Sequence, residues 1–127
     1  MNETRSILVI DDDPDIALYC TAVLEPQGYN VRSAPSAQEG EAALREQQPD
    51  LVILDIMMES PDSGLHLATT LAQDFPGLPV ILFSSIADAS AQIFDTSALP
   101  VAAFIEKPIR PEDLLEAVQG ALGKKAS

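Results

Sequence analysis

Four short apolar runs constrain the fold of this chain of 127 residues more than any other feature. They are continuous and rich in β-branched residues, which is typical of strands buried on both faces of a parallel sheet. A polar or charged residue follows each run. The runs are ILVI at 7–10 before Asp11 and Asp12, LVIL at 51–54 before Asp55, VILF at 80–83 before Ser84, and AAFIE at 102–106 before Lys107. Ligand sites of open α/β sheets lie at the carboxyl ends of the strands, so we expect these side chains to meet at one edge.

Helical segments separate the predicted strands. Strands are predicted at 6–10, 29–33, 51–54, 79–83 and 102–105, and helices at 14–27, 37–48, 63–75, 87–95 and 111–123. Pro14 suits the first turn of a helix, and Ser36 with Glu39 is typical of a capping box. This alternation predicts right-handed crossovers and a doubly wound, five-stranded parallel sheet with five helices on its two faces. We expect one domain over residues 1–127, with an ordered core at 4–123, a tail at 124–127 and no output domain.

Composition excludes several classes of partner. The 20 acidic and 7 basic residues give a net charge of −13, whereas a nucleic-acid phosphate backbone is held by clustered basic residues. No apolar stretch approaches the roughly 20 residues of a membrane helix. The single Cys20 lies on an apolar helical stripe, so we expect a buried thiol and a reducing compartment. These features predict a cytoplasmic protein that binds neither nucleic acid nor membrane.

The predicted cluster of polar residues indicates phosphoryl-transfer chemistry. Two carboxylates about 4 Å apart repel each other by about 4 kcal/mol at an effective dielectric of about 20, so three of them favour a bound cation. Oxygen ligands with open positions suit Mg²⁺, which is commonly shared with a phosphate. A carboxylate can accept a phosphoryl group, while a lysine and a hydroxyl stabilise the phosphoryl oxygens. The residues therefore predict a Mg²⁺ site at which the protein itself is phosphorylated.

Together, four motifs in this order resemble the receiver domain of bacterial two-component response regulators. They are ILVIDD at 7–12, DLVILD at 50–55, PVILFS at 79–84 and FIEKP at 104–108, and the resemblance covers nearly the whole chain. It implies a flavodoxin-like fold with the strand order 2-1-3-4-5.

The resemblance also assigns roles to the residues around the predicted metal. It implies that Asp55 is the phosphoacceptor and that Asp11 and Asp12 form the acidic pair that holds Mg²⁺, with Asp12 as the direct ligand. Met57 is expected to add its backbone carbonyl.

Three further residues have implied roles in the response to phosphorylation. Ser84 and Phe104 stand at the hydroxyl and aromatic switch positions, and Lys107 is expected to pair with the phosphoryl group.

The implied donor is a histidine kinase or a histidine phosphotransfer protein, and the implied target is an effector protein or an output domain outside this chain. Such a domain catalyses only its own phosphorylation and dephosphorylation, so we do not expect an enzyme. The face of the fourth helix, fifth strand and fifth helix is the candidate dimer contact.

Departures from the family pattern keep alternatives open. Residues 59–63 contain a one-residue insertion relative to the family, which leaves the shape of that loop open. A receiver that acts as a scaffold without being phosphorylated remains an alternative. A hydrolase of the haloacid-dehalogenase type is less favoured, because it needs an aspartate where Met57 stands. Leu18 lies off the apolar helical stripe, and it is equally well explained as an isolated exposed leucine or as part of a kinase contact.

Overall fold

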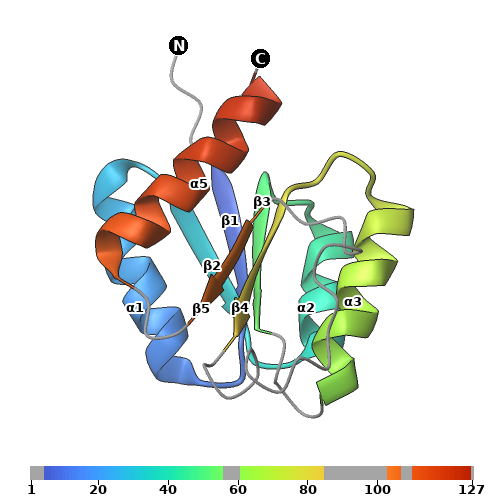
Figure 1. The fold of residues 1–127 in the computed structure, drawn as a ribbon. Helices are drawn as coiled ribbons and strands as arrows, with labels where there is room; N and C mark the ends of the chain where they lie inside the picture. Colours follow the sequence, from blue (N-terminus) through green and yellow to red (C-terminus); the bar gives the residue numbers. More distant parts are fainter. Residues whose placement is uncertain (1–4, 56–60, 85–102, 107–109, 127) are drawn as a thin grey trace.

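A parallel five-stranded sheet forms the centre of the computed structural model, which describes residues 5–55, 61–84, 103–106 and 110–126 (Figure 1). The order across the sheet is β2-β1-β3-β4-β5, and every neighbouring pair is parallel. The strands are β1 (Ser6–Ile10), β2 (Asn30–Ala34), β3 (Leu51–Asp55), β4 (Val80–Ser84) and β5 (Ala103–Glu106). The predicted parallel α/β sheet is therefore confirmed.

Helices cover both faces of this sheet. Figure 1 shows α1 and α5 on one face, and α2 and α3 on the other. Their bounds are α1 (Pro14–Leu24, continued by a 3₁₀ turn at Glu25–Gln27), α2 (Ala37–Glu46), α3 (Pro61–Asp74) and α5 (Pro111–Ala126). The predicted helix at 87–95 lies outside the described residues.

Alternation along the strands divides the core into two apolar layers. In β1, Ile7 and Val9 pack with residues of α1 and α5, whereas Leu8 and Ile10 pack with residues of α2 and α3. All four side chains are fully buried. Successive side chains of a strand point to opposite faces, so a continuous apolar run is what a sheet covered on both sides requires.

The observed elements differ from the predicted ones at several ends. The prediction that α3 begins near Ser63 is wrong, because the helix begins at Pro61, and a proline suits the first helical position, where its missing N–H costs nothing. The prediction that the last helix ends at Gly123 is also wrong, since α5 continues to Ala126. One glycine costs a helix only about 1 kcal/mol, and the lysines that follow are good helix formers whose charge suits a helix C-terminus.

The buried-thiol prediction for Cys20 is confirmed. Cys20 is fully buried in the layer that α1 shares with α5. Desolvation raises the pKa of the neighbouring Tyr19, and the charges of Cys20, Glu112 and Asp113 raise it further. Glu112 and Asp113 belong to the first turn of α5, which packs beside α1 and where negative charge complements the helix dipole.

Arg45 joins α2 to α3 on the opposite face. Its Nη2 atom lies 2.9 Å from Glu41 Oε2 and 2.5 Å from Asp74 Oδ2. The guanidinium carbon is 5.4 Å from the centre of the Phe75 ring, within the range of a cation–π contact. The hydrogen bond to Asp74 is the main reason why the pKa of Arg45 is raised, and the hydrogen bond to Glu41 raises it further. The C-terminal half of α2 is thus tied to α3.

Ser36 caps α2, and its replacement by alanine should lower the free energy of unfolding by about 1 kcal/mol. The Ser36 hydroxyl accepts a hydrogen bond of 3.1 Å from the Glu39 amide, which alanine cannot accept. Urea unfolding followed by circular dichroism measures the loss. Ser36→Asp keeps an acceptor and should stay close to wild type. Equal midpoints for wild type and Ser36→Ala would contradict this role.

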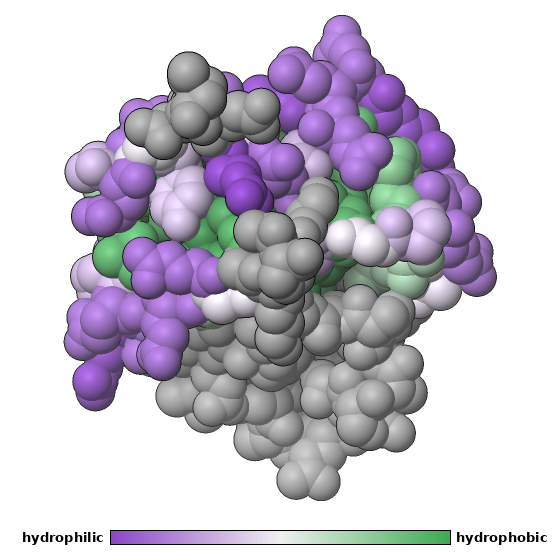
Figure 2. Space-filling view, turned by 90° about the horizontal axis from the view of Figure 1, so that it is seen from above, coloured by the Kyte–Doolittle hydropathy of each residue, from purple (hydrophilic) through white to green (hydrophobic). Residues whose placement is uncertain are grey.

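Polar residues dominate the described surface at the end of the molecule seen from above. Figure 2 shows mainly hydrophilic residues there, with smaller apolar areas among them. Within the described ranges, no helix has the length and apolar character needed to cross a membrane.

Candidate metal centre

Three carboxylates meet at the carboxyl edge of the sheet. Asp11 follows β1, and Asp55 is the last residue of β3. The parallel pairing of these strands places Ile10 opposite Leu54. The residues that follow this pair are Asp11 and Asp55, so the two aspartates lie side by side. One oxygen from each of Asp11, Asp12 and Asp55 lies within 4.8 Å of the other two. We call these three residues the carboxylate cluster.

Neighbouring backbone groups hold Asp11 from two sides. The Asp11 amide donates a hydrogen bond of 3.1 Å to the carbonyl of Ala34, at the end of β2. The Asp11 Oδ1 atom accepts one of 2.9 Å from the amide of Asp13, which is the N-cap of α1. The side chain is therefore positioned both by the edge of the sheet and by the start of the following helix.

Burial differs sharply within the cluster. Asp11 and Asp55 are 3% and 4% exposed, whereas Asp12 is exposed to solvent. Buried charges are costly unless they are paired, hydrogen-bonded or bound to a metal. Asp12 thus offers a carboxylate that water and ions can reach, beside two that are largely withdrawn from water.

The donor set of the cluster fits a hard divalent cation. At the 4.8 Å limit of its oxygen separations, two full charges repel by about 3.5 kcal/mol at an effective dielectric of about 20. Water around Asp12 screens part of this repulsion. Carboxylate oxygens are the ligands that Mg²⁺ prefers, and it usually takes one or two protein carboxylates and retains several waters. The cluster could hold Mg²⁺ and leave coordination positions open.

Of the other predicted site residues, the structure describes the backbone of Ser84 and Phe104. Ser84 ends β4, and the pairing of Asp55 with Phe83 puts the backbone of Ser84 one residue beyond that of Asp55, at the same edge. Phe104 pairs with Leu82 within the sheet. Met57 and Lys107 lie outside the described residues, as do Glu59 and Ser60 of the predicted insertion at 59–63.

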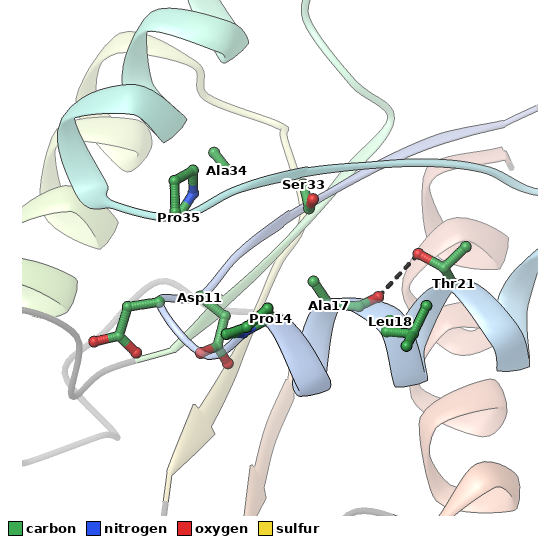
Figure 3. A pocket seen from close by; sticks show the side chains of 9 residues that line it. Asp11, Pro14, Ala17, Leu18, Thr21, Ser33, Ala34 and Pro35 are labelled. Atoms are coloured by element: carbon green, nitrogen blue, oxygen red, sulfur yellow. Dashed lines mark hydrogen bonds between the residues drawn. The ribbon is translucent and has the colours of Figure 1, made fainter.

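Sequence reasoning missed a groove beside the cluster. The groove has a volume of about 490 Å³ and runs between α1 and the end of β2 (Figure 3). Leu18, on its α1 side, is 68% exposed, as expected for a residue off the apolar stripe. The β2 side of the groove carries no motif, and α1 and β2 contact each other although they are separate segments of the sequence, so no local pattern indicated the groove. The lining residues are Asp11, Asp12, Pro14, Ala17, Leu18, Thr21, Ser33, Ala34 and Pro35.

Known proteins are similar to this chain in sequence and in fold. The family model described as the response regulator receiver domain matches residues 7–119. The transcriptional regulatory protein GlrR of Escherichia coli (strain K12) is 34% identical over 123 residues, which cover 94% of this chain and 27% of that protein. This chain thus spans about a quarter of the length of GlrR.

Solved structures place the chain beside receiver domains of the flavodoxin-like fold. NtrX from Brucella abortus superposes with a TM-score of 0.87 at 30% identity, over 98% of this chain and 28% of that one. A response regulator receiver domain protein from Clostridium thermocellum superposes with a TM-score of 0.84 at 28% identity, over 96% of this chain and 97% of that one.

Proposed function

Because this chain belongs to the family of response regulator receiver domains, we propose that it is a phosphoacceptor switch of a two-component phosphorelay, with Asp55 as the acceptor. The observation that carries the proposal is the carboxylate cluster, in which Asp55 lies beside Asp11 and Asp12 at the carboxyl edge of the sheet. The donor is a histidine kinase or a histidine phosphotransfer protein.

The three carboxylates have different roles in phosphoryl transfer. An Asp55 oxygen attacks the phosphorus of a phosphohistidine in line, so a new O–P bond forms as the P–N bond breaks and its electron pair leaves with the imidazole. Asp12, which is exposed, would be the direct ligand of Mg²⁺, and Asp11, Asp55 and the backbone carbonyl of Met57 would complete the site that holds it. When bound, Mg²⁺ neutralises the carboxylates and the incoming phosphoryl oxygens.

Phosphorylation is read out by residues on the neighbouring strands. Lys107 pairs with the phosphoryl group, and the Ser84 hydroxyl donates to it. Movement of Ser84 is accompanied by movement of Phe104 and shifts the population between two packings of the surface around β5 and α5. An effector protein or an output domain recognises the shifted state, and the chain acts as a cytoplasmic switch rather than as an enzyme on other substrates.

Labelling with acetyl phosphate tests the proposal. With Mg²⁺ present, the wild-type protein should gain one phosphoryl group, observed as an intact-mass increase, and Asp55→Asn should gain none. Asp15→Asn also removes one carboxylate, at the exposed first turn of α1, and should label like wild type.

Each alternative function predicts a different result, and the hydrolase is tested in a separate assay with a phosphomonoester. A wild-type protein that binds Mg²⁺ and gains no phosphoryl group would be a scaffold-type receiver. Turnover of a phosphomonoester would indicate a hydrolase. Labelling of Asp55→Asn would contradict the assignment of the acceptor.

A further inference from the structure

We infer that Gly40 of α2 is a positioning residue for the carboxylate cluster, because its missing side chain lets α2 pack directly against Ile10 and so seats Asp11. The inference rests on the proposed function of the cluster as a Mg²⁺ site. It concerns a residue that lies on a helix and has no side chain of its own to offer a ligand.

The contact between Gly40 and Ile10 leaves no room for a side chain. A Cβ atom at position 40 would lie 2.6 Å from Ile10 Cδ1, 2.7 Å from Cγ1 and 2.8 Å from Cγ2. Because Cγ1 and Cγ2 are both bonded to the Cβ of Ile10, the overlap is not confined to a flexible end. The χ1 angle of a β-branched residue is also strongly restricted. Ile10 is fully buried, so an added methyl group must displace either Ile10 or α2.

Displacement of Ile10 would act directly on the cluster. Ile10 is the last residue of β1, and Asp11 follows it in the chain. A shift of the Ile10 backbone therefore moves the Asp11 carboxylate relative to Asp55, which is anchored on the neighbouring strand.

Displacement of α2 would reach the same residue by a second route. The N-cap of α2, Ser36, comes two residues after Ala34, whose carbonyl accepts the Asp11 amide hydrogen bond of 3.1 Å. Movement of α2 at this end therefore pulls on the bond that holds the Asp11 backbone. The other end of α2 is tied by Arg45 to Asp74, and the carbonyl of its C-cap Gln47 accepts a 2.9 Å hydrogen bond from Arg32.

Gly120 provides a matched control. It also lies within a helix, α5, but a Cβ atom there would have nothing within 4 Å. Gly120→Ala tests the general effect of replacing a helical glycine, whereas Gly40→Ala adds the overlap with Ile10.

Two measurements on the folded protein test the inference. Gly40→Ala should weaken Mg²⁺ binding by about tenfold in isothermal titration calorimetry, which is the lower end of the loss found when the support of a metal ligand is removed. It should also speed hydrogen exchange of the Asp11 amide, measured by NMR without metal. Gly120→Ala should change neither quantity.

A double-mutant cycle separates positioning from stability. Ile10→Ala removes all three atoms that the new methyl group would meet, so Gly40→Ala made in that background should leave Mg²⁺ affinity unchanged. The double variant should remain less stable than wild type because it lacks the Ile10 side chain. A purely structural role would instead make Mg²⁺ affinity follow stability in every variant.

The remaining outcomes are distinguishable. If Gly40→Ala does not fold, Ile10→Val, which removes only Cδ1, supplies a milder background in which Gly40→Ala should still weaken Mg²⁺ binding. Unchanged Mg²⁺ affinity and unchanged Asp11 exchange in folded Gly40→Ala would overturn the inference. Absence of Mg²⁺ binding by the wild-type protein would count against the proposed function, and Asp11 exchange would still report on the role of Gly40.

Discussion

Replacing Asp12 with asparagine is expected to raise the free energy of unfolding of the metal-free protein by about 1–2 kcal/mol. The substitution removes one of three negative charges whose oxygens lie within 4.8 Å of one another. Full repulsion at that distance would be larger, but Asp12 is exposed and water screens its charge. Urea unfolding in the presence of EDTA, at low ionic strength, measures the gain.

The same substitution should remove most of the stabilisation that Mg²⁺ confers. A ligand that binds only the folded state stabilises it by about 2.7 kcal/mol at a free concentration of 100 times its Kd. Without the exposed carboxylate that we assign as the direct ligand, this stabilisation should fall below about 1 kcal/mol at the same Mg²⁺ concentration.

Asp15→Asn controls for the loss of one negative charge at the start of α1, and it should keep the full response to Mg²⁺. Asp11 is less suitable for this experiment, because its carboxylate also accepts the amide hydrogen bond of Asp13. An Asp12→Asn variant that is destabilised without metal and still stabilised by Mg²⁺ would show that the cluster does not work as proposed.

Truncation of Phe83 to alanine is expected to lower the free energy of unfolding by about 3–5 kcal/mol. Phe83 is fully buried in β4, and it packs in the layer that includes Leu114 and Val118 of α5. Removing the ring discards its transfer free energy and leaves a cavity that the rigid sheet can close only in part. Small domains are stable by only about 5–15 kcal/mol, so this loss is a large share of the total.

Phe83→Leu keeps most of the apolar volume and should cost less than about 1.5 kcal/mol. The denaturation midpoint of Phe83→Ala should fall while the slope of the free energy against urea concentration stays close to that of wild type. A loss no larger for alanine than for leucine would mean that the layer between the sheet and α5 is loosely packed. Asp55 pairs with Phe83 in the sheet. The Mg²⁺ affinity of folded Phe83→Ala would therefore also show whether the loss of the ring disturbs the carboxylate cluster.

The sequence already located the strands, because runs such as those of β1 and β3 can be buried on both faces only in a covered parallel sheet. Their ends were harder to predict. β2 ends at Ala34 and α3 begins at Pro61, each displaced from its predicted position. Element ends depend on strand pairing, on caps and on local turns, and the apolar pattern does not encode these contacts.

By itself, the sequence determined that aspartates stand at the ends of β1 and β3, because a charged residue that directly follows a buried apolar strand is expected at the edge of the sheet. Only the tertiary structure decided how close Asp11, Asp12 and Asp55 come to one another, and that Gly40 must stay without a side chain beside Ile10. Both depend on strand register and helix packing between segments far apart in the chain. No local pattern carries that information, since each distance is set by the shapes of two partners at once.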